Sequence, residues 1–66
     1  MLAFRELYAR FHHDIFRFAY WLSGNAAEAE DIAPESFVRT WTNMGRIRTE
    51  TLKAYLLRIA RNTYLG

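Results

Sequence analysis

Residues 2–22 read LAFRELYARFHHDIFRFAYWL, and this stretch decides the fold. Its apolar residues recur at intervals of three and four, and neither glycine nor proline interrupts them. They are Phe4, Leu7, Tyr8, Phe11, Ile15, Phe18, Ala19 and Leu22. This spacing predicts one long amphipathic helix, roughly 31 Å from end to end at 1.5 Å per residue.

The sequence Ser23-Gly24-Asn25 predicts the end of this helix and the start of a second one. Gly24 can adopt the left-handed conformation that follows a helix. Asn25 can cap the next helix, with Glu28 three positions later in the manner of a capping box. We expect the second helix over residues 26–43. Its predicted inner face consists of Ala29, Ile32, Ala33, Phe37, Trp41 and Met44.

Pro34 conflicts with an uninterrupted second helix, because it has no N–H to donate to the Glu30 carbonyl and its ring clashes with that carbonyl. The sequence therefore predicts a kink or a break near Pro34. In the alternative, a short helix ends near Ile32 and Pro34 occupies the first position of a new one. We favour the kink, since Ala33 would be a poor N-cap.

Gly45 is expected to end the second helix, and residues 46–50 form a short connector with Thr49 or Thr51 available as the next cap. A third helix is predicted over residues 50–65. Its expected core stripe is Leu52, Leu56, Ile59 and Thr63, with Tyr55 beside it. Three helices joined by short connectors predict an all-α three-helix bundle.

Length and composition exclude several classes of protein. A chain of 66 residues forms one small domain, and its core supplies too little stability for a deep, rigid enzyme cleft. It has no cysteine, which rules out disulfides, thiolate zinc sites and cysteine nucleophiles. His12 and His13 are adjacent, unlike the i, i+4 pair that binds zinc on a helix. Since we find no signal peptide or membrane span, we expect a cytoplasmic protein that is not an enzyme and uses no cofactor or metal.

The charges are separated along the chain. Residues 1–43 carry six carboxylates and four arginines, whereas residues 44–66 carry five cations and one carboxylate. Potentials of opposite sign attract different partners. The basic end therefore suggests a polyanion as its partner, and the acidic middle suggests a basic protein surface.

Aromatic residues are more numerous than a small core needs. His12, Phe16 and Tyr20 form a second stripe on the first helix, and Trp21 lies outside the main stripe as well. Either the fold covers this helix on two sides, or part of its surface awaits another helix, chain or subunit. Self-association of the chain is one such outcome.

Two motifs carry a family resemblance. Residues 29–41 read AEDIAPESFVRTW, and residues 55–62 read YLLRIARN. The chain resembles, over essentially its whole length, region 2 of the extracytoplasmic-function (ECF) group of bacterial sigma factors, whose helix motif is approximately Ala-Glu-Asp-Ile-Ala-Gln-Glu-Thr-Phe-Val-Arg-Ala-Trp. By this resemblance residues 1–66 form a region 2 domain. The short helix that often precedes it and the C-terminal promoter-binding domain are expected to be absent.

The resemblance implies that the acidic motif binds core RNA polymerase, at the coiled coil of its largest subunit. The implied contact residues are Asp31, Pro34, Glu35 and Arg39. Asp31 and Glu35 are four residues apart and share one helix face, where they can accept hydrogen bonds from arginines of a partner. Pro34 departs from the family, which usually has glutamine at this place.

The resemblance also implies that the connector and third helix recognise and open the −10 element of a promoter, with residues 43–51 beside a flipped base of the non-template strand. The implied DNA contacts are Arg46, Arg48, Lys53, Tyr55, Arg58, Arg61 and Asn62. The first three suit phosphates, and Asn62 suits a base edge. Tyr55 is either a stacking platform or a buried core ring. Melting of this kind needs no catalytic residue, because capture of the base offsets the cost of unpairing.

Two rival functions remain at this stage. The chain could be a helical interaction module that binds a regulator, such as an anti-sigma factor, without binding DNA. It could also bind double-stranded DNA as a helix-turn-helix protein. Residues 43–51 are long for that tight turn, and the chain shows no dimerisation zipper.

Overall fold

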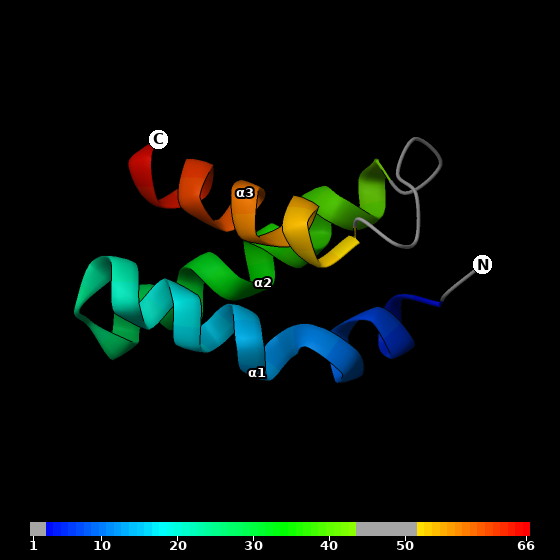
Figure 1. The fold of residues 1–66 in the computed structure, drawn as a ribbon, viewed down its shortest axis with the longest axis horizontal. Coiled ribbons are helices and arrows are strands. Elements are labelled where there is room, and N and C mark those ends of the chain that lie inside the picture. The colour runs from blue at the N-terminus through cyan, green and yellow to red at the C-terminus, as the bar shows by residue number, and fades with distance from the viewer. Residues whose placement is uncertain (1–2, 44–51) are drawn as a thin grey trace.

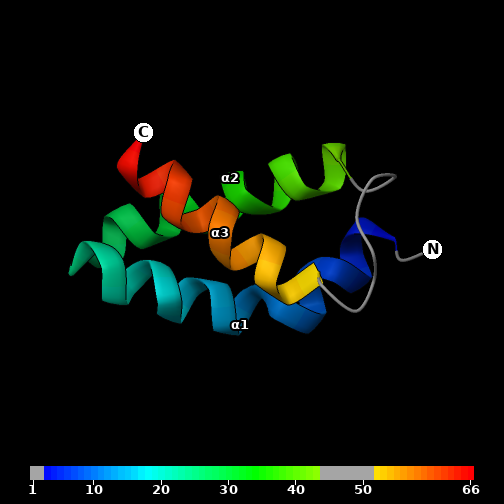
Figure 2. The same cartoon turned by 45° about the horizontal axis from the view of Figure 1, so that its top comes forward.

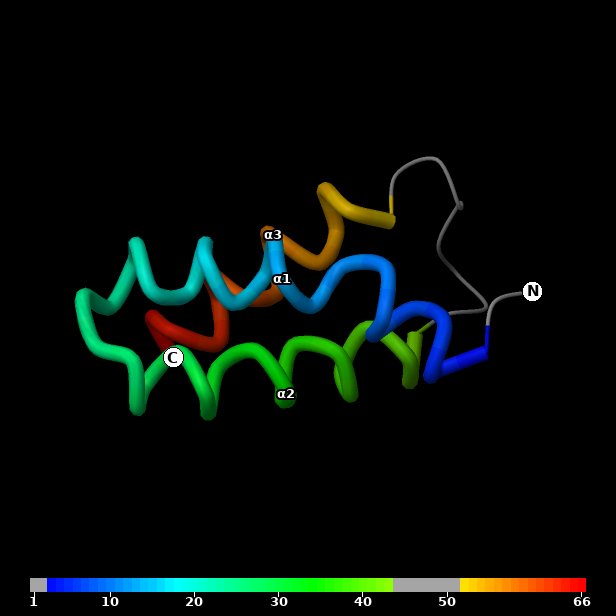
Figure 3. Tube along the Cα trace, turned by 90° about the horizontal axis from the view of Figure 1, so that it is seen from below, coloured from blue at the N-terminus to red at the C-terminus, as the bar shows by residue number. Residues whose placement is uncertain are grey.

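The computed structural model of the chain describes residues 3–43 and 52–66. Three helices occupy them: α1 spans Phe4–Ser23, α2 spans Ala26–Thr42 and α3 spans Leu52–Leu65. α1 and α3 run in the same direction, and α2 returns in the opposite direction behind them (Figure 1 and Figure 3). Figure 2 shows α3 over the seam between the other two helices. Each pair of helices is in contact, so the predicted all-α three-helix bundle is confirmed.

In the turn between α1 and α2, Gly24 and Asn25 take their predicted roles. Only half of the predicted capping box forms, because the Asn25 N–H donates to the Ser23 hydroxyl oxygen at 3.2 Å and not to Glu28. Gly24 adopts the left-handed conformation with φ 68°, and its N–H donates to the Tyr20 carbonyl oxygen at 2.7 Å. The Asn25 side-chain oxygen accepts from the Glu28 N–H at 3.0 Å, which satisfies one of the free amides at the start of α2. The local hydrogen bonds of this turn therefore fix where one helix ends and the next begins.

Pro34 lies inside α2, which continues as one helix on both sides of it. The predicted break, and with it the alternative of two short helices meeting at Pro34, is therefore wrong. The predicted kink stays a prediction. Pro34 itself is exposed, so its ring displaces no core side chain, and the cost of placing it here is confined to the backbone of α2.

The core lies where all three helices meet. Its buried apolar residues are Leu7, Ile15 and Ala19 of α1, Ala29, Ile32, Ala33 and Phe37 of α2, and Leu52, Leu56 and Ala60 of α3. Phe37 is the largest fully buried side chain among the described residues. Two alanines of α2 and one of α3 belong to this set, so the helix backbones can approach one another closely.

Several expected core positions differ. Trp41 is 37% exposed and packs edge-on against Phe4, with ring centroids 5.7 Å apart. Ser36 and Thr40 are fully buried in its place, and the Ser36 hydroxyl donates to the Ile32 carbonyl oxygen at 2.7 Å. That bond offsets the cost of burying the Ser36 hydroxyl. The Thr40 hydroxyl oxygen, in contrast, is buried and has no hydrogen-bond partner among the described residues.

Two further expectations about the core were wrong. In α3, Ala60 takes the buried position that we expected Ile59 and Thr63 to share, and those two side chains are half-buried. In α1, Phe4 and Tyr8 belong to the expected stripe yet lie at its rim, 37% and 40% exposed. Met44 lies outside the described residues.

The second aromatic stripe of α1 divides into two parts. Phe16 is partly buried and packs against the core, while Tyr20 and Trp21 are 48% and 76% exposed. The fold thus covers only the first part of this stripe. Within the described residues, no helix is both long and apolar enough to cross a membrane.

Candidate functional site

The acidic side chains of α2 line an open groove of about 260 Å³ between α2 and the end of α3. What we call the acidic surface consists of Glu28, Asp31 and Glu35. The opposite side of the groove is formed by Thr63 and Tyr64 of α3. The i, i+4 spacing predicts Asp31 and Glu35 on one face, whereas Glu28 is predicted only as part of the helix start. Its spacing of three and seven residues from the other two would have placed it on the same face.

Two of the predicted polymerase-binding residues bind each other. The Arg39 guanidinium lies 2.7 Å from a Glu35 carboxylate oxygen, and both side chains are about half exposed. The pair has the i, i+4 spacing at which side chains meet on a helix. The Glu35 charge is therefore partly neutralised from within α2, whereas Asp31 is exposed one turn away.

The groove also contains a polar atom without a partner. The Thr63 hydroxyl oxygen is buried and makes no hydrogen bond among the described residues, although its side chain lines the groove. Tyr64 beside it is 40% exposed. The groove is therefore formed by two helices, although all three carboxylates of the acidic surface lie on α2.

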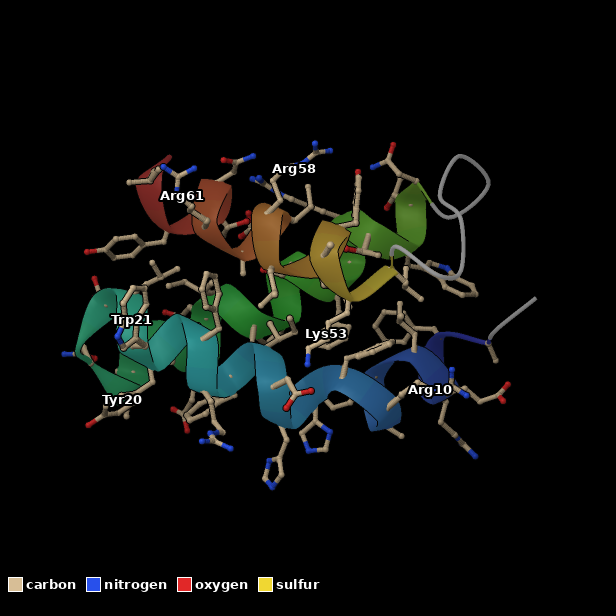
Figure 4. The ribbon with its side chains drawn as sticks, in the orientation of Figure 1. Arg10, Tyr20, Trp21, Lys53, Arg58 and Arg61 are labelled. Atoms are coloured by element: carbon tan, nitrogen blue, oxygen red, sulfur yellow. The ribbon has the colours of Figure 1, made fainter. Side chains whose placement is uncertain are left out.

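The cations of α3 lie on a second surface. Arg58, Arg61 and Asn62 are exposed, and together with Tyr55 they form what we call the basic surface (Figure 4). The Arg58 guanidinium carbon lies 5.2 Å from the centre of the Tyr55 ring, within range of a cation–π contact. Tyr55 is half-buried, so it is neither a fully exposed platform nor a core ring.

Lys53 is separated from the basic surface. Its ammonium nitrogen lies 3.3 Å from a carboxylate oxygen of Asp14, so the pair joins α3 to α1. Lys53 is predicted to contact phosphates together with Arg46 and Arg48, and these two arginines lie outside the described residues. In this structure Lys53 thus serves first as a link between helices.

The described helices hold opposite charges on separate surfaces. α2 carries four carboxylates and one arginine, and α3 carries three cations and no carboxylate. Within residues 3–43 and 52–66, no ion pair joins a cation of α3 to a carboxylate of α2. Over the same residues, no three His, Asp or Glu side chains are arranged to hold a metal ion.

Comparison with known proteins gives a family match and several relatives. The family model described as Sigma-70 region 2 matches residues 7–65. The ECF RNA polymerase sigma factor SigE of Mycolicibacterium smegmatis is 34% identical over 65 residues, covering 98% of this chain and 25% of the relative. BldN of Streptomyces coelicolor, also described as an ECF RNA polymerase sigma factor, is 34% identical over 62 residues, 91% of this chain and 24% of the relative.

A third ECF RNA polymerase sigma factor, SigM of Bacillus subtilis, is 27% identical over 60 residues. The match covers 91% of this chain and 37% of that relative. The chain therefore spans between about a quarter and two fifths of these proteins. No solved structure matches it significantly.

Proposed function

The chain belongs to the Sigma-70 region 2 family, and from that premise we propose that it binds core RNA polymerase through α2 and the −10 element of a promoter, as a single strand, through α3. As a sigma-factor domain it serves transcription initiation and performs no catalysis of its own. Its place of action would be the bacterial cytoplasm, and an anti-sigma factor would be a further partner.

The acidic surface suits a basic protein partner. Asp31 and Glu35 are exposed and one turn apart on α2, so an arginine of the polymerase can approach both carboxylates. In the free domain Arg39 already forms an ion pair with Glu35. Because a bidentate arginine–carboxylate contact is stronger than a half-exposed pair within a helix, binding would exchange one partner of Glu35 for another.

The basic surface suits a nucleic-acid strand. Arg58 and Arg61 are exposed and three residues apart on α3, a spacing that lets both reach successive phosphates of a single strand. Asn62 presents a donor and an acceptor, as reading a base edge requires. Holding a strand that has left the duplex lowers the free energy of the open form, so this surface favours melting without a reactive group.

One observation carries the proposal: the carboxylates of α2 and the cations of α3 do not pair with each other within residues 3–43 and 52–66. Two surfaces of opposite charge on a bundle only 33 × 21 × 17 Å in extent can engage two partners at once. If the charges paired with each other, the domain would have one neutral surface, and it could not attract a basic protein to one side and a polyanion to another.

A crossed pair of variants tests both surfaces. Asp31→Asn with Glu35→Gln should abolish capture of the chain by immobilised core polymerase while leaving retention of a labelled single-stranded −10 oligonucleotide on nitrocellulose intact. Arg58→Ala with Arg61→Ala should do the reverse. Each variant thus serves as the folding control for the other.

The outcomes separate the proposal from its rivals. If both variants lose both partners equally, a single surface is at work and the proposal is wrong. Retention without any preference for the promoter sequence would instead indicate a helical interaction module. Tighter retention of the duplex than of the single strand would favour a double-stranded DNA binder.

A further inference from the structure

A second groove lies between α1 and α3 and has no part in the function proposed above. It is open, has a volume of about 360 Å³, and is lined by Asp14, Arg17 and Phe18 of α1 and by Lys53 and Leu57 of α3. Phe18 and Leu57 are half-buried, whereas the three charged residues are exposed. Asp14 and Lys53 pair with each other, so Arg17 leaves the rim net positive, and the groove suits a flat, partly apolar group with negative charge near Arg17.

An exposed tryptophan stands at the side of this groove. Trp21 is 76% exposed, more than any other large apolar side chain among the described residues. Its indole stacks on Phe18, with ring centroids 6.1 Å apart and planes 22° apart. Phe18 in turn packs against the core. The indole is therefore held in place from one side while its surface remains open to solvent.

One cation lies near the indole on α1, and another lies beyond the groove on α3. On α1, Arg17 lies at the groove four residues before Trp21, so the two share one face of that helix. On α3, Arg61 lies four residues after Leu57, which lines the groove. Figure 4 shows the Arg61 side chain on the outer edge of α3, on the side away from α1, so a strand bound there would pass around α3 to reach the indole.

This combination selects the chemistry of the partner. A large aromatic ring left in water does not stabilise the fold, since burial is what makes such a side chain favourable. A purely apolar partner would have to cover Arg17, whose desolvation is costly. A single strand of nucleic acid meets both requirements, because its bases stack on aromatic rings and its phosphates bind the neighbouring cations.

We propose that Trp21 stacks a base of single-stranded DNA, and that the strand held by Arg58 and Arg61 continues across the groove onto α1. The inference rests on the function proposed above. It extends that function by adding Trp21 and Arg17 to the binding site, neither of which the family motif contains. Loss of one stacked base should weaken binding by about 5- to 150-fold.

The first test measures binding of a single-stranded −10 oligonucleotide to the full 66-residue chain. Trp21→Ala should weaken binding within that range, and Trp21→Phe should restore part of it, because phenylalanine keeps a ring. Tyr20→Ala is the matched control: Tyr20 is the adjacent aromatic, 48% exposed, and its ring lies beside Phe16 instead of Phe18. The Tyr20→Ala variant should bind the oligonucleotide with the affinity of the unsubstituted chain.

The second test observes the indole directly. The chain has two tryptophans, so Trp41→Phe leaves Trp21 as the sole tryptophan, and excitation at the red edge of the indole band avoids the four tyrosines. Adding the oligonucleotide should quench its emission and protect it from acrylamide. Circular dichroism of each variant confirms that the helices are retained.

Each outcome decides the inference. Weaker binding of Trp21→Ala, with rescue by Trp21→Phe and quenching of the indole, supports it. Equal binding by Trp21→Ala and Tyr20→Ala overturns it while the proposed function stands. No binding of the oligonucleotide by the unsubstituted chain overturns both. Loss of polymerase capture by Trp21→Ala, with oligonucleotide binding unchanged, would show that a protein covers this face and also overturns it.

Discussion

The helices α2 and α3 differ in how their charges relate to the helix that carries them. In α2 an acidic residue, Glu28, stands in the first turn and a basic one, Arg39, in the last turn. Both positions are favoured by the helix dipole, which is positive at the N-terminal end and negative at the C-terminal end. Much of the charge of α2 therefore stabilises α2 itself.

In α3 the charges gain nothing from the dipole. Its last turn contains no basic residue and its first turn no acidic one. Lys53 even lies at the second position, where the dipole is positive, and Asp14 of α1 offsets that cost through an ion pair. The helix dipole does not account for Arg58 or Arg61, although Arg58 also makes a contact within α3, with the Tyr55 ring. The charges of α2 are explained in part by the stability of their own helix, whereas the cations of α3 are not explained by the dipole. The cations of α3 are therefore the stronger evidence for a partner outside the domain.

The largest expected effect removes the core that holds the two helices. Phe37→Ala should destabilise the fold by about 3–5 kcal/mol, because Phe37 is fully buried and its ring lies 4.9 Å from that of Tyr8. A domain of this size has only roughly 3–5 kcal/mol to lose. Urea titration followed by circular dichroism should find the variant largely unfolded. Val38→Ala, at the exposed neighbouring position, is the control and should change stability by less than about 0.5 kcal/mol.

The next effect concerns α2 alone. Pro34→Gln restores the N–H that the Glu30 carbonyl lacks, so α2 should straighten and gain up to about 3 kcal/mol in stability. Capture by core polymerase should tighten in a titration. Pro34→Ala restores the same N–H without an amide side chain, and so separates the effect of the helix from that of a side-chain contact. Equal or weaker polymerase affinity of Pro34→Gln would contradict this prediction.

Local features of the fold could be predicted from the sequence because neighbouring residues decide them. Gly24 and Asn25 determine the turn through hydrogen bonds within four residues. Trp41 was assigned to the core on periodicity alone, and this failed because its indole meets Phe4 of another helix at the rim. Periodicity tells which face of a helix is apolar. It does not tell how far along that face the neighbouring helix extends.

The candidate site shows the same limit. The pairing of Glu35 with Arg39 is local, and its i, i+4 spacing could have indicated it. The pairing of Lys53 with Asp14 joins residues far apart in the chain, so no spacing rule predicts it. The groove that places Arg17 beside Leu57 likewise requires two helices to pack. Contacts between exposed residues of different helices are therefore the part of the site that could not be predicted from the sequence.

The basic surface is tested by its dependence on salt. Each phosphate contact with a single strand contributes about 0.7 to the slope of log affinity against log salt. Arg58→Ala with Arg61→Ala should therefore lower the magnitude of that slope by roughly 1.4. The ratio of the affinity of the unsubstituted chain to that of the double variant should then fall by roughly 25-fold between 0.1 and 1 M salt. Arg5→Ala, a loss of charge on α1, should leave the slope unchanged. An unaltered slope in the double variant would show that neither arginine contacts the phosphates of the strand.

The smallest effect comes from the one carboxylate among the described residues that pairs with a cation of α3. Asp14→Asn breaks a half-exposed ion pair and should cost less than about 1 kcal/mol in stability. It also releases Lys53, so a single strand should bind more tightly and the salt slope should rise by up to about 0.7. Lys53→Gln alone should cost equally little stability and should not raise the slope. If Asp14→Asn raises the slope even when Lys53→Gln is present, the gain comes from net charge alone, and Lys53 belongs to the helix interface and not to the basic surface.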